Sequence, residues 1–258
     1  MGIKKILKGQ ISKYPKICYV HIPKCGGVSL IDSLYKATYP MWVNAAPVRR
    51  TIDLNASKMV ANIFGLDMMY VRMILLSEHL ARPTNIFVHG HTAVSSKILN
   101  EFCHDWKFIT VLRDPVDRYI SEFVYNTYKS SDWLKNDLNI EQYVDSEKSL
   151  NSATTITRFL TGMSYEQILE KGHQRSVDEA ITNLDMFFSV GFLDSLSNWK
   201  SSLNDRLNIK LSIDVKNSSP NKSATKQITE KKEILDKVNM LCEIDADIYK
   251  QAKAKFSI

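Results

Sequence analysis

The chain has 258 residues, of which 44% are hydrophobic and 24% are charged, and this composition is typical of a soluble globular protein. Its 34 basic and 28 acidic residues give a formal net charge of +6. No block of like charge is long enough for a nucleic-acid-binding arm. An anionic substrate would account for the excess of positive charge as well as a nucleic acid would, and a basic surface without a partner is a third explanation. The four cysteines are scattered without a CxxC pair, which argues against a disulfide framework and a zinc site and fits a reducing compartment.

The basic N-terminal segment contains no apolar stretch of the length that a signal peptide or a membrane span requires. We therefore expect a cytoplasmic protein without a transmembrane segment. The length allows one large α/β domain or two small ones. Because the sequence contains no internal repeat and no clear domain boundary, we predict a single domain over residues 1–258.

In the first half of the chain, residues 17–22 form an apolar run typical of a central strand, and residues 29–36 carry apolar residues at helical spacing. Residues 40–55 are predicted to be a loop. A helix is predicted over residues 56–81, followed by a strand at 85–88 and a helix over 95–104. The expected inner face of the 56–81 helix consists of Met59, Ile63, Leu66, Met69, Met73 and Leu76.

In the second half, the strongest strand signal is at residues 107–112. Asp114 and Pro115 follow it as helix cap and first-turn proline, so a helix begins there. Residues 128–150 are polar and are expected to vary in shape. Helices are predicted over about 151–161 and from Tyr165, a strand over 186–191, a helix from Asp194, a loop over 214–227 and a final amphipathic helix. That final helix carries Ile234, Val238, Leu241, Ile248 and Tyr249.

The alternation of strands and helices predicts an α/β fold with a central, mostly parallel, P-loop-like sheet flanked by helices. The segment from Lys24 to Ser29 lies between the first strand and the first helix of this sheet. Its glycines, Gly26 and Gly27, let backbone N–H groups approach a ligand, and a helix N-terminus favours anions. Lys24 adds a positive charge. The segment therefore indicates a site for phosphate-like oxygens.

This loop differs from two better-known phosphate loops. NTPases place the lysine after the last glycine, whereas Lys24 precedes Gly26 and Gly27. A phosphatase loop built on Cys25 would need an arginine six residues later, where Ile31 stands. The remaining alternative is a tight turn between strand and helix with a solvated lysine.

A second phosphate-binding pattern follows the strand at residues 107–112. Arg113 stands at the end of that strand, where an open α/β sheet binds its ligands. Arginine suits bidentate phosphate binding, and Ser121 adds a hydroxyl about two turns into the next helix. The alternative is a surface arginine beside a helix cap.

Together, PKCGGVSL and LRDPVDRYISEF resemble the 5′-phosphosulfate loop and the 3′-phosphate motif of sulfotransferases that use 3′-phosphoadenosine 5′-phosphosulfate. The branch resembled contains the heparan sulfate 2-O- and 6-O-sulfotransferases and their bacterial relatives. Weaker similarity covers 151–162, 189–196 and the C-terminal segment from Asn217. The similarity thus extends from about residue 17 to 252.

This resemblance implies a role for each matching residue. Lys24, Gly26, Gly27 and Ser29 would hold the 5′-phosphosulfate, and Arg113 and Ser121 the 3′-phosphate. The family usually has threonine where Cys25 and Val28 stand, so Val28 would contribute only its backbone N–H. Arg158 is a further candidate contact to the cofactor, as are Lys222 and Lys226. The product would be 3′-phosphoadenosine 5′-phosphate, and no metal is required.

His89-Gly90-His91 follows the strand predicted at 85–88, and the 2-O-sulfotransferase branch draws its catalytic base from such a segment. Histidine is suited to accept a proton near neutral pH, and we favour His91 over His89. Structural histidines are the alternative, and a zinc site with Cys103 and His104 has poor ligand spacing. Arg49, Arg50, Lys58 and Arg72 are candidate contacts to an acidic glycan.

The predicted activity is therefore in-line sulfuryl transfer to an acceptor hydroxyl, with a carbohydrate as the expected acceptor class. A nucleotide kinase with a P-loop is one alternative, although it would need Mg²⁺ ligands and a lysine after the glycines. A non-catalytic nucleotide-binding module is the other, and it would have its histidines turned away from the ligand.

Overall fold

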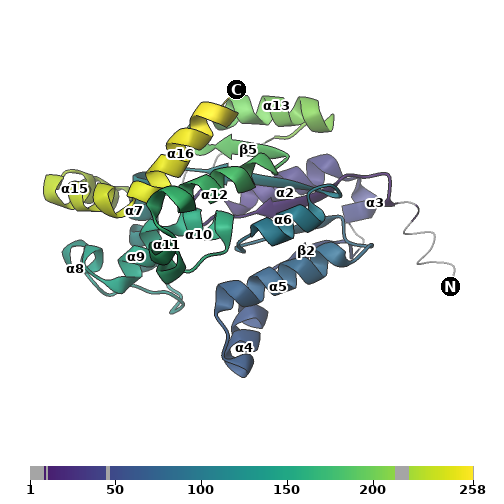
Figure 1. Cartoon of the computed structure of the whole chain (residues 1–258). Helices are drawn as coiled ribbons and strands as arrows, with labels where there is room; N and C mark the ends of the chain where they lie inside the picture. Colours follow the sequence, from purple (N-terminus) through teal and green to yellow (C-terminus); the bar gives the residue numbers. More distant parts are fainter. Residues whose placement is uncertain (1–8, 10, 45–46, 213–220, 258) are drawn as a thin grey trace.

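A computed structural model describes residue 9 and residues 11–44, 47–212 and 221–257, without the side chains of residues 28, 29 and 222. Its centre is a sheet of five parallel strands in the order β2-β3-β1-β4-β5 (Figure 1). The strands are β1 (Lys16–Val20), β2 (Arg49–Thr51), β3 (Phe87–Gly90), β4 (Trp106–Leu112) and β5 (Ser189–Phe192). The predicted α/β fold with a helix-flanked parallel sheet is confirmed.

The central strands are apolar because both of their faces are covered. Cys18 in β1 pairs with Val88 in β3 on one side and with Phe108 in β4 on the other. All three side chains are fully buried. This arrangement makes β1 the middle strand. The glycine loop that follows it therefore lies at the carboxyl ends of the strands, in the middle of the sheet.

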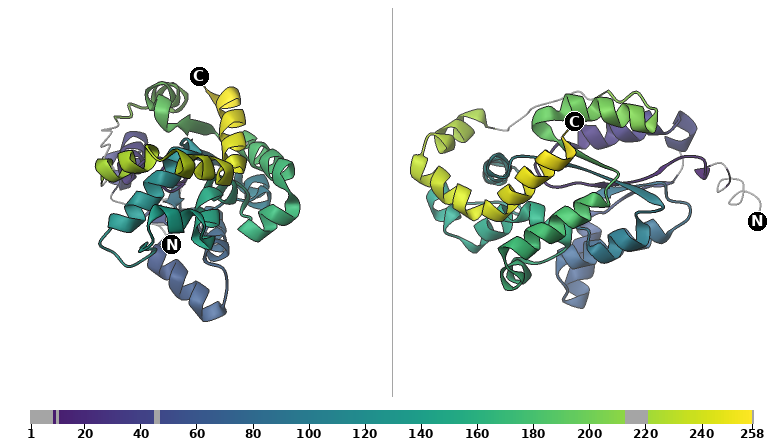
Figure 2. Two further views of the ribbon diagram at one scale, coloured as in Figure 1. Left: turned by 90° about the vertical axis from the view of Figure 1, so that its left-hand side faces the viewer. Right: turned by 45° about the horizontal axis from the view of Figure 1, so that its top comes forward.

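Helices cover both faces of the sheet (Figures 1 and 2). One face packs against α2 (Val28–Thr38), α3 (Met41–Asn44) and α13 (Leu196–Leu207). The other packs against α5 (Met68–Ala81), α6 (Ser96–Phe102), α10 (Thr155–Thr161), α12 (His173–Asp185) and α16 (Glu243–Phe256). Chain connections therefore leave the sheet on both sides, as a doubly covered parallel sheet requires.

A third group of helices lies beyond the carboxyl ends of the strands, on the left in Figure 1. It has its own apolar cluster, in which Tyr119, Phe123 and Val238 are buried. Its members are α7 (Pro115–Tyr128), α8 (Ile140–Val144), α9 (Glu147–Ala153), α14 (Lys222–Thr229) and α15 (Lys232–Leu241). These helices form one wall beside the sheet end at which the glycine loop emerges.

Several sequence predictions are wrong between residues 40 and 81. Residues 40–55, predicted as a loop, contain α3 and the edge strand β2. The predicted helix over 56–81 is divided into α4 (Leu54–Phe64) and α5, because Gly65 adopts a left-handed conformation with φ of 62° and Asp67 caps the next helix. Met59 and Ile63 are 65% and 68% exposed, so the apolar face expected for this part of the helix is not internal.

Other differences follow from short helices with local caps. Residues 128–150 contain α8, which Asn139 and Gln142 begin with a capping box, and most of α9. The predicted 151–161 helix is divided at Thr154 between α9 and α10. Of the predicted 214–227 loop, residues 222–227 belong to α14, and 214–220 lie outside the described residues. The final helix is divided at Cys242 into α15 and α16.

The remaining helical segments are the short α11 (Tyr165–Lys171), as predicted from Tyr165, and a 3₁₀ turn, η1 (Leu193–Ser195), before α13. In the described part of the chain, no single helix has the length and apolar character needed to cross a membrane. Only the bent pair of α4 and α5 reaches that length and composition together. Leu76 and Leu80, in the second half of α5, are buried in the core.

Candidate functional site

The candidate site lies where β1 and β4 end side by side. From β1 the chain continues toward β2 on one side of the sheet, and from β4 it continues toward β5 on the other. Parallel sheets bind their ligands at the carboxyl ends of two such strands, because the connections part there and leave a crevice. The glycine loop follows β1 and Arg113 follows β4, so the topology brings the two predicted phosphate-binding segments together.

The glycine loop has a strained backbone. Lys24 has a φ of 66° and Gly26 a φ of 120°, values that residues with a Cβ rarely adopt. A Cβ on Gly26 would meet only ordinary contacts, the nearest at 3.8 Å from Leu30, so conformation rather than space requires glycine there. Strain of this kind concentrates at ligand-binding sites.

The N-terminus of α2 is open. Gly27 is its N-cap residue, with extended dihedral angles, and no side chain caps the helix among the residues described. The first N–H groups of a helix lack intrahelical acceptors and carry partial positive charge. They therefore form a ready donor set for an anion at the loop.

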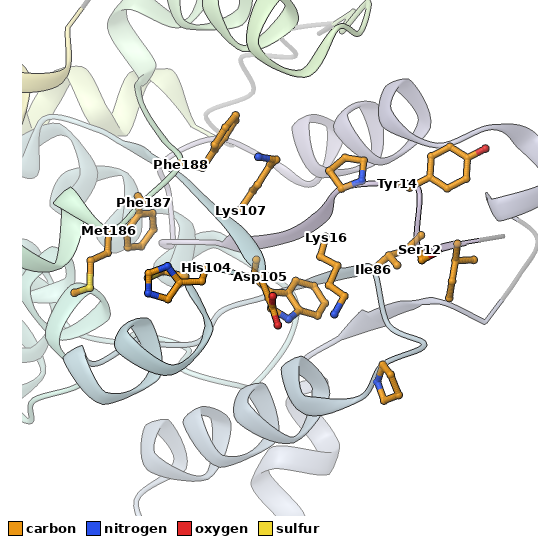
Figure 3. Close-up of a pocket in the computed structure, with 15 residues that line it drawn as sticks. Ser12, Tyr14, Lys16, Ile86, His104, Asp105, Lys107, Met186, Phe187 and Phe188 are labelled. Carbon is orange, nitrogen blue, oxygen red and sulfur yellow. The ribbon is translucent and has the colours of Figure 1, made fainter. Parts of the chain in front are cut away.

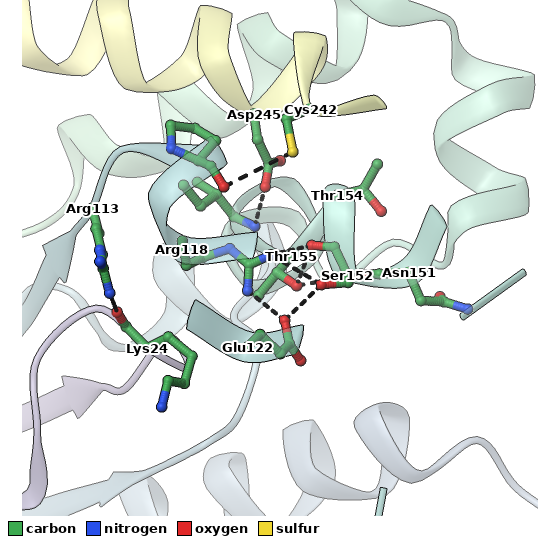
Figure 4. Close-up of polar contacts among 12 residues, drawn as sticks. Lys24, Arg113, Arg118, Glu122, Asn151, Ser152, Thr154, Thr155, Cys242 and Asp245 are labelled. Carbon is green, nitrogen blue, oxygen red and sulfur yellow. Dashed lines mark hydrogen bonds and ion pairs between the residues drawn. The ribbon is translucent and has the colours of Figure 1, made fainter. Parts of the chain in front are cut away.

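Lys24 and Arg113 meet at the loop. The Arg113 guanidinium donates from Nη1 to the Lys24 carbonyl oxygen over 3.3 Å (Figure 4). The Lys24 ammonium lies 4.1 Å from the centre of the Tyr125 ring on α7. Partial burial, followed by the charge of Arg113, lowers the pKa of Lys24. The negative charge of Glu122 opposes this lowering, and a bound anion would oppose it further.

The other predicted cofactor contacts differ in what they offer. Ser121 is half-buried on α7, two turns from the start of the helix that follows Arg113. Arg158, on α10, donates to the Asn151 carbonyl over 3.4 Å, and its buried Nε has no acceptor in the described structure. The side chains of Val28 and Ser29 lie outside what the structure describes, although their backbone begins α2.

Cys25 faces away from the loop surface. Its side chain is 1% exposed and belongs to the main core cluster, and burial raises the pKa of its thiol to about 12. Its N–H donates to the Ile22 carbonyl over 3.3 Å. Neither its thiol nor its N–H is therefore free for a ligand in this conformation, and a cysteine nucleophile is disfavoured as well.

His91 has one ring nitrogen free. Its Nδ1 lies 2.8 Å from the carbonyl oxygen of His21, and because a carbonyl only accepts, Nδ1 carries the proton. Arg72 holds the His91 carbonyl from Nη1 at 3.0 Å. Nε2 is then the unprotonated nitrogen, with no partner among the described residues. Desolvation lowers the pKa of His91, which keeps this nitrogen unprotonated at neutral pH.

His89 is committed to internal contacts instead. Its Nε2 accepts from Arg49 Nε at 3.1 Å and lies 2.8 Å from the Thr51 hydroxyl. Its side chain is buried, and burial lowers its pKa to about 4. Arg49 in turn pairs with Asp32 at 2.7 Å. Of the two histidines, His91 has the geometry of a proton acceptor.

Two of the residues predicted as glycan contacts have internal partners as well. Arg72 is buried and donates to the His91 carbonyl oxygen at 3.0 Å. Arg49 binds His89 and Asp32. Lys226, predicted near the cofactor, is exposed on α14 and lies 3.8 Å from Glu230. The side chain of Lys222 is outside the described structure.

Sequence reasoning missed the acidic group beside the site. Glu122 Oε2 accepts from Arg118 Nη1 at 2.6 Å and from the Ser152 hydroxyl at 2.8 Å (Figure 4). Arg118 is completely buried. The negative charge of Glu122 raises the pKa values of Lys24 and His91 and so partly offsets the lowering by burial. The spacing of Arg118 and Glu122 by four residues on a helix was the signal that could have identified this pair.

A cavity of about 440 Å³ opens at the opposite end of the strands, where β1 and β4 begin (Figure 3). Lys16 and Lys107, at the amino ends of β1 and β4, line it together with Cys103 and His104. Parallel sheets bind ligands at their carboxyl ends, so we do not place the site there. Because His89 and His91 lie at the other end of the sheet, these histidines and Cys103 cannot share one zinc ion.

Comparison with known proteins adds no assignment. Neither the family models nor the curated proteins searched match this chain.

Proposed function

We propose that the protein is a sulfotransferase that moves a sulfuryl group from 3′-phosphoadenosine 5′-phosphosulfate to an acceptor hydroxyl, with a carbohydrate as the expected acceptor class. The observation that carries the proposal is the contact between Lys24 and Arg113. These residues come from the two motifs on which the sequence resemblance rests, and they meet at the carboxyl edge of the sheet.

The residues present fit the charge of this donor. Its 5′-phosphosulfate suits the open start of α2, where Lys24 and the backbone of Gly26 and Gly27 supply positive charge and N–H groups. Its 3′-phosphate suits Arg113 and Ser121, a guanidinium and a hydroxyl. A mononucleotide without the second phosphate would leave Arg113 without an anionic partner.

When bound, the donor supplies the sulfuryl group and a phosphate leaving group. The chain supplies positioning and charge, which provide most of the rate in transfers of this type. Lys24 and the N–H groups of α2 would stabilise negative charge on the transferred group and the leaving oxygen. His91 Nε2 would take the proton of the acceptor hydroxyl. The hydroxyl oxygen would form the new bond to sulfur as the bond from sulfur to the leaving phosphate oxygen breaks. Glu122 would favour the resulting imidazolium.

The test is transfer of labelled sulfate from the donor to a panel of glycans and small hydroxyl compounds, with wild-type protein and His91→Ala. We expect transfer by the wild type and a turnover about 100- to 10,000-fold lower in H91A, because a general base contributes that much. His104→Ala, at the opposite edge of the sheet, is the matched histidine control and should retain wild-type turnover.

Calorimetry with 3′-phosphoadenosine 5′-phosphate separates this proposal from its alternatives. Tight binding of this product without transfer to any acceptor would indicate a binding module. Binding of ATP with Mg²⁺ in its place would indicate a kinase. Wild-type turnover in H91A would refute the role of His91 while leaving the reaction intact.

A further inference from the structure

His21 lies between the glycine loop and His91, and the proposed reaction gives it no role. It is the residue directly after β1, and its side chain is only 8% exposed. Its ring contacts the loop on one side and the His91 ring on the other. A buried histidine with both neighbours in a candidate site calls for an explanation beyond packing.

The first contact fixes the loop backbone. His21 Nε2 lies 2.8 Å from the Gly26 carbonyl oxygen, so Nε2 carries a proton and donates. In a trans peptide the carbonyl and the following N–H point in opposite directions, and the chain has no cis peptide among the residues described. By holding the Gly26 carbonyl, His21 turns the Gly27 N–H away from itself. This is the N–H at the open start of α2.

The second contact fixes His91. The two imidazole rings are stacked, with centroids 4.2 Å apart and an interplanar angle of 26°. The backbone carbonyl of His21 also accepts the Nδ1 proton of His91. The ring of His21 thus covers one face of the His91 ring, while its backbone selects the His91 tautomer that leaves Nε2 unprotonated.

Stacking at this distance requires that the two rings are not charged at the same time, because two imidazolium ions in contact would repel each other. Burial, followed by the charge of His91, lowers the pKa of His21 to about 3, so it is uncharged at physiological pH. The charged groups facing His91 are then Arg72, which opposes its protonation, and Glu122, which favours it.

We propose that His21 is a positioning residue that joins the anion-binding loop to the proton acceptor, with its Nε2–H orienting the Gly26–Gly27 peptide and its ring supporting His91. This inference rests on the proposed function for its catalytic meaning. Its structural content is independent, because it concerns two contacts within the chain. The two contacts use different parts of one side chain, so substitution can separate them.

The experiment compares His21→Phe with His21→Gln. Phenylalanine keeps an aromatic ring beneath His91 but cannot donate to Gly26. Glutamine has an amide N–H that can reach Gly26 but has no ring to cover His91. The measurements are the affinity for 3′-phosphoadenosine 5′-phosphate by calorimetry and the pKa of His91 by NMR without ligand, with the His91 signal assigned from H91A.

For H21F we expect about tenfold weaker nucleotide binding, because one orienting hydrogen bond is lost, with the His91 pKa unchanged. For H21Q we expect nearly wild-type nucleotide binding and a higher His91 pKa, because solvent reaches the uncovered ring and desolvation is the main cause of its lowered value. In the transfer assay, the acid limb of the pH–rate profile of H21Q should move to higher pH by the same amount as the His91 pKa.

Wild-type affinity in H21F, or a wild-type His91 pKa in H21Q, would overturn the proposal. Nitrogen NMR of the wild-type protein provides a test that needs no variant, since we expect a proton on Nε2 of His21 and on Nδ1 of His91. The opposite tautomer for either ring would overturn the proposal equally. If the wild type bound no nucleotide, the proposed function would fail, whereas the tautomers and the His91 pKa would still decide the role of His21.

Discussion

Two helices start at neighbouring strand ends in this protein, and they start differently. At α7, the Asp114 carboxylate accepts the N–H of Asp117 at 3.0 Å, and Pro115 occupies the first turn. At α2, the equivalent cap is Gly27, and no side chain caps the helix in the described structure. The chain thus closes one positive helix end with its own carboxylate and leaves the other without a side-chain cap. Other described helices, such as α12 and α15, also begin without a side-chain cap, so an uncapped start indicates a candidate anion site only together with its place at the carboxyl end of a central strand.

The most direct way to remove this difference between the two helix starts is to give α2 the side-chain cap that α7 has. Gly27 is exposed and extended, with φ of −85° and ψ of 177°, so Gly27→Asp requires no left-handed backbone. Its carboxylate would lie beside the N–H of Leu30, which donates to the Gly27 carbonyl oxygen at 3.0 Å, in the position from which Asp114 accepts the N–H of Asp117. We expect affinity for 3′-phosphoadenosine 5′-phosphate to fall about a hundredfold or more in calorimetry, because a fixed negative charge would occupy the anion position. The melting temperature should not decrease.

Gly27→Asn and Gly27→Ala are the matched controls for this substitution. Asparagine also caps a helix but carries no charge. Alanine neither caps a helix nor carries a charge. If all three variants lost binding equally, the cause would be the added Cβ rather than the carboxylate. Unchanged binding in G27D would place the anion elsewhere and contradict the proposed site.

A third helix start, that of α10, is closed by a residue distant in sequence. Asp245 on α16 accepts the N–H groups of Ile156 and Thr157 at 2.7 and 2.9 Å, and the Thr157 hydroxyl at 2.6 Å. Asp245 is fully buried, and desolvation raises its pKa to about 6 despite these hydrogen bonds. This carboxylate is therefore a structural cap, and α10 is held by α16 rather than by its own N-cap residue.

Asp245→Asn should destabilise the fold by about 2 kcal/mol, because one buried donor loses its best acceptor. It should also change the pH dependence of stability. A carboxyl whose pKa is raised on folding contributes stability that is present below about pH 4 and is lost as pH rises through about 6. Urea unfolding between pH 4 and 7 should show this loss in the wild type and a flatter profile in D245N.

Asp247→Asn, on the same helix, is the control for D245N. Asp247 is half-exposed and pairs with His173 at 2.7 Å, and such surface pairs contribute about 1 kcal/mol or less. If D245N and D247N had the same unfolding free energy and the same pH profile, the assignment of Asp245 as a buried cap would be wrong.

The sequence predicted the parts of the fold that depend on local patterns. Strands β1 and β4 are apolar on both faces, and Asp114 with Pro115 marks the start of α7, so each could be identified from neighbouring residues. The edge strand β2 has only three residues, two of them arginines, and pairs only with β3 in the described structure. Nothing in its own composition distinguishes it from a loop.

The candidate site shows the same division. Lys24, the glycines and Arg113 form continuous motifs, so sequence alone could select them. His21 and Asp245 depend on contacts between elements that are far apart in the chain. His21 faces His91 across 70 positions, and Asp245 caps a helix 89 positions away. Such pairs become visible only when the sheet and its surrounding helices bring them together.

The smallest expected effect comes from opening the helix start that the chain keeps closed. Asp114→Ala removes the cap of α7 and should cost about 1 kcal/mol of unfolding free energy in urea titrations. Affinity for 3′-phosphoadenosine 5′-phosphate should stay near the wild-type value, because Arg113 and Ser121 remain in place and no charge is added at the loop. A gain of affinity would show that the start of α7, not that of α2, holds the anion, because removing the Asp114 carboxylate opens that helix end to an anion. The two substitutions therefore decide between the helix starts, since each changes one cap and leaves the other strand end as it is.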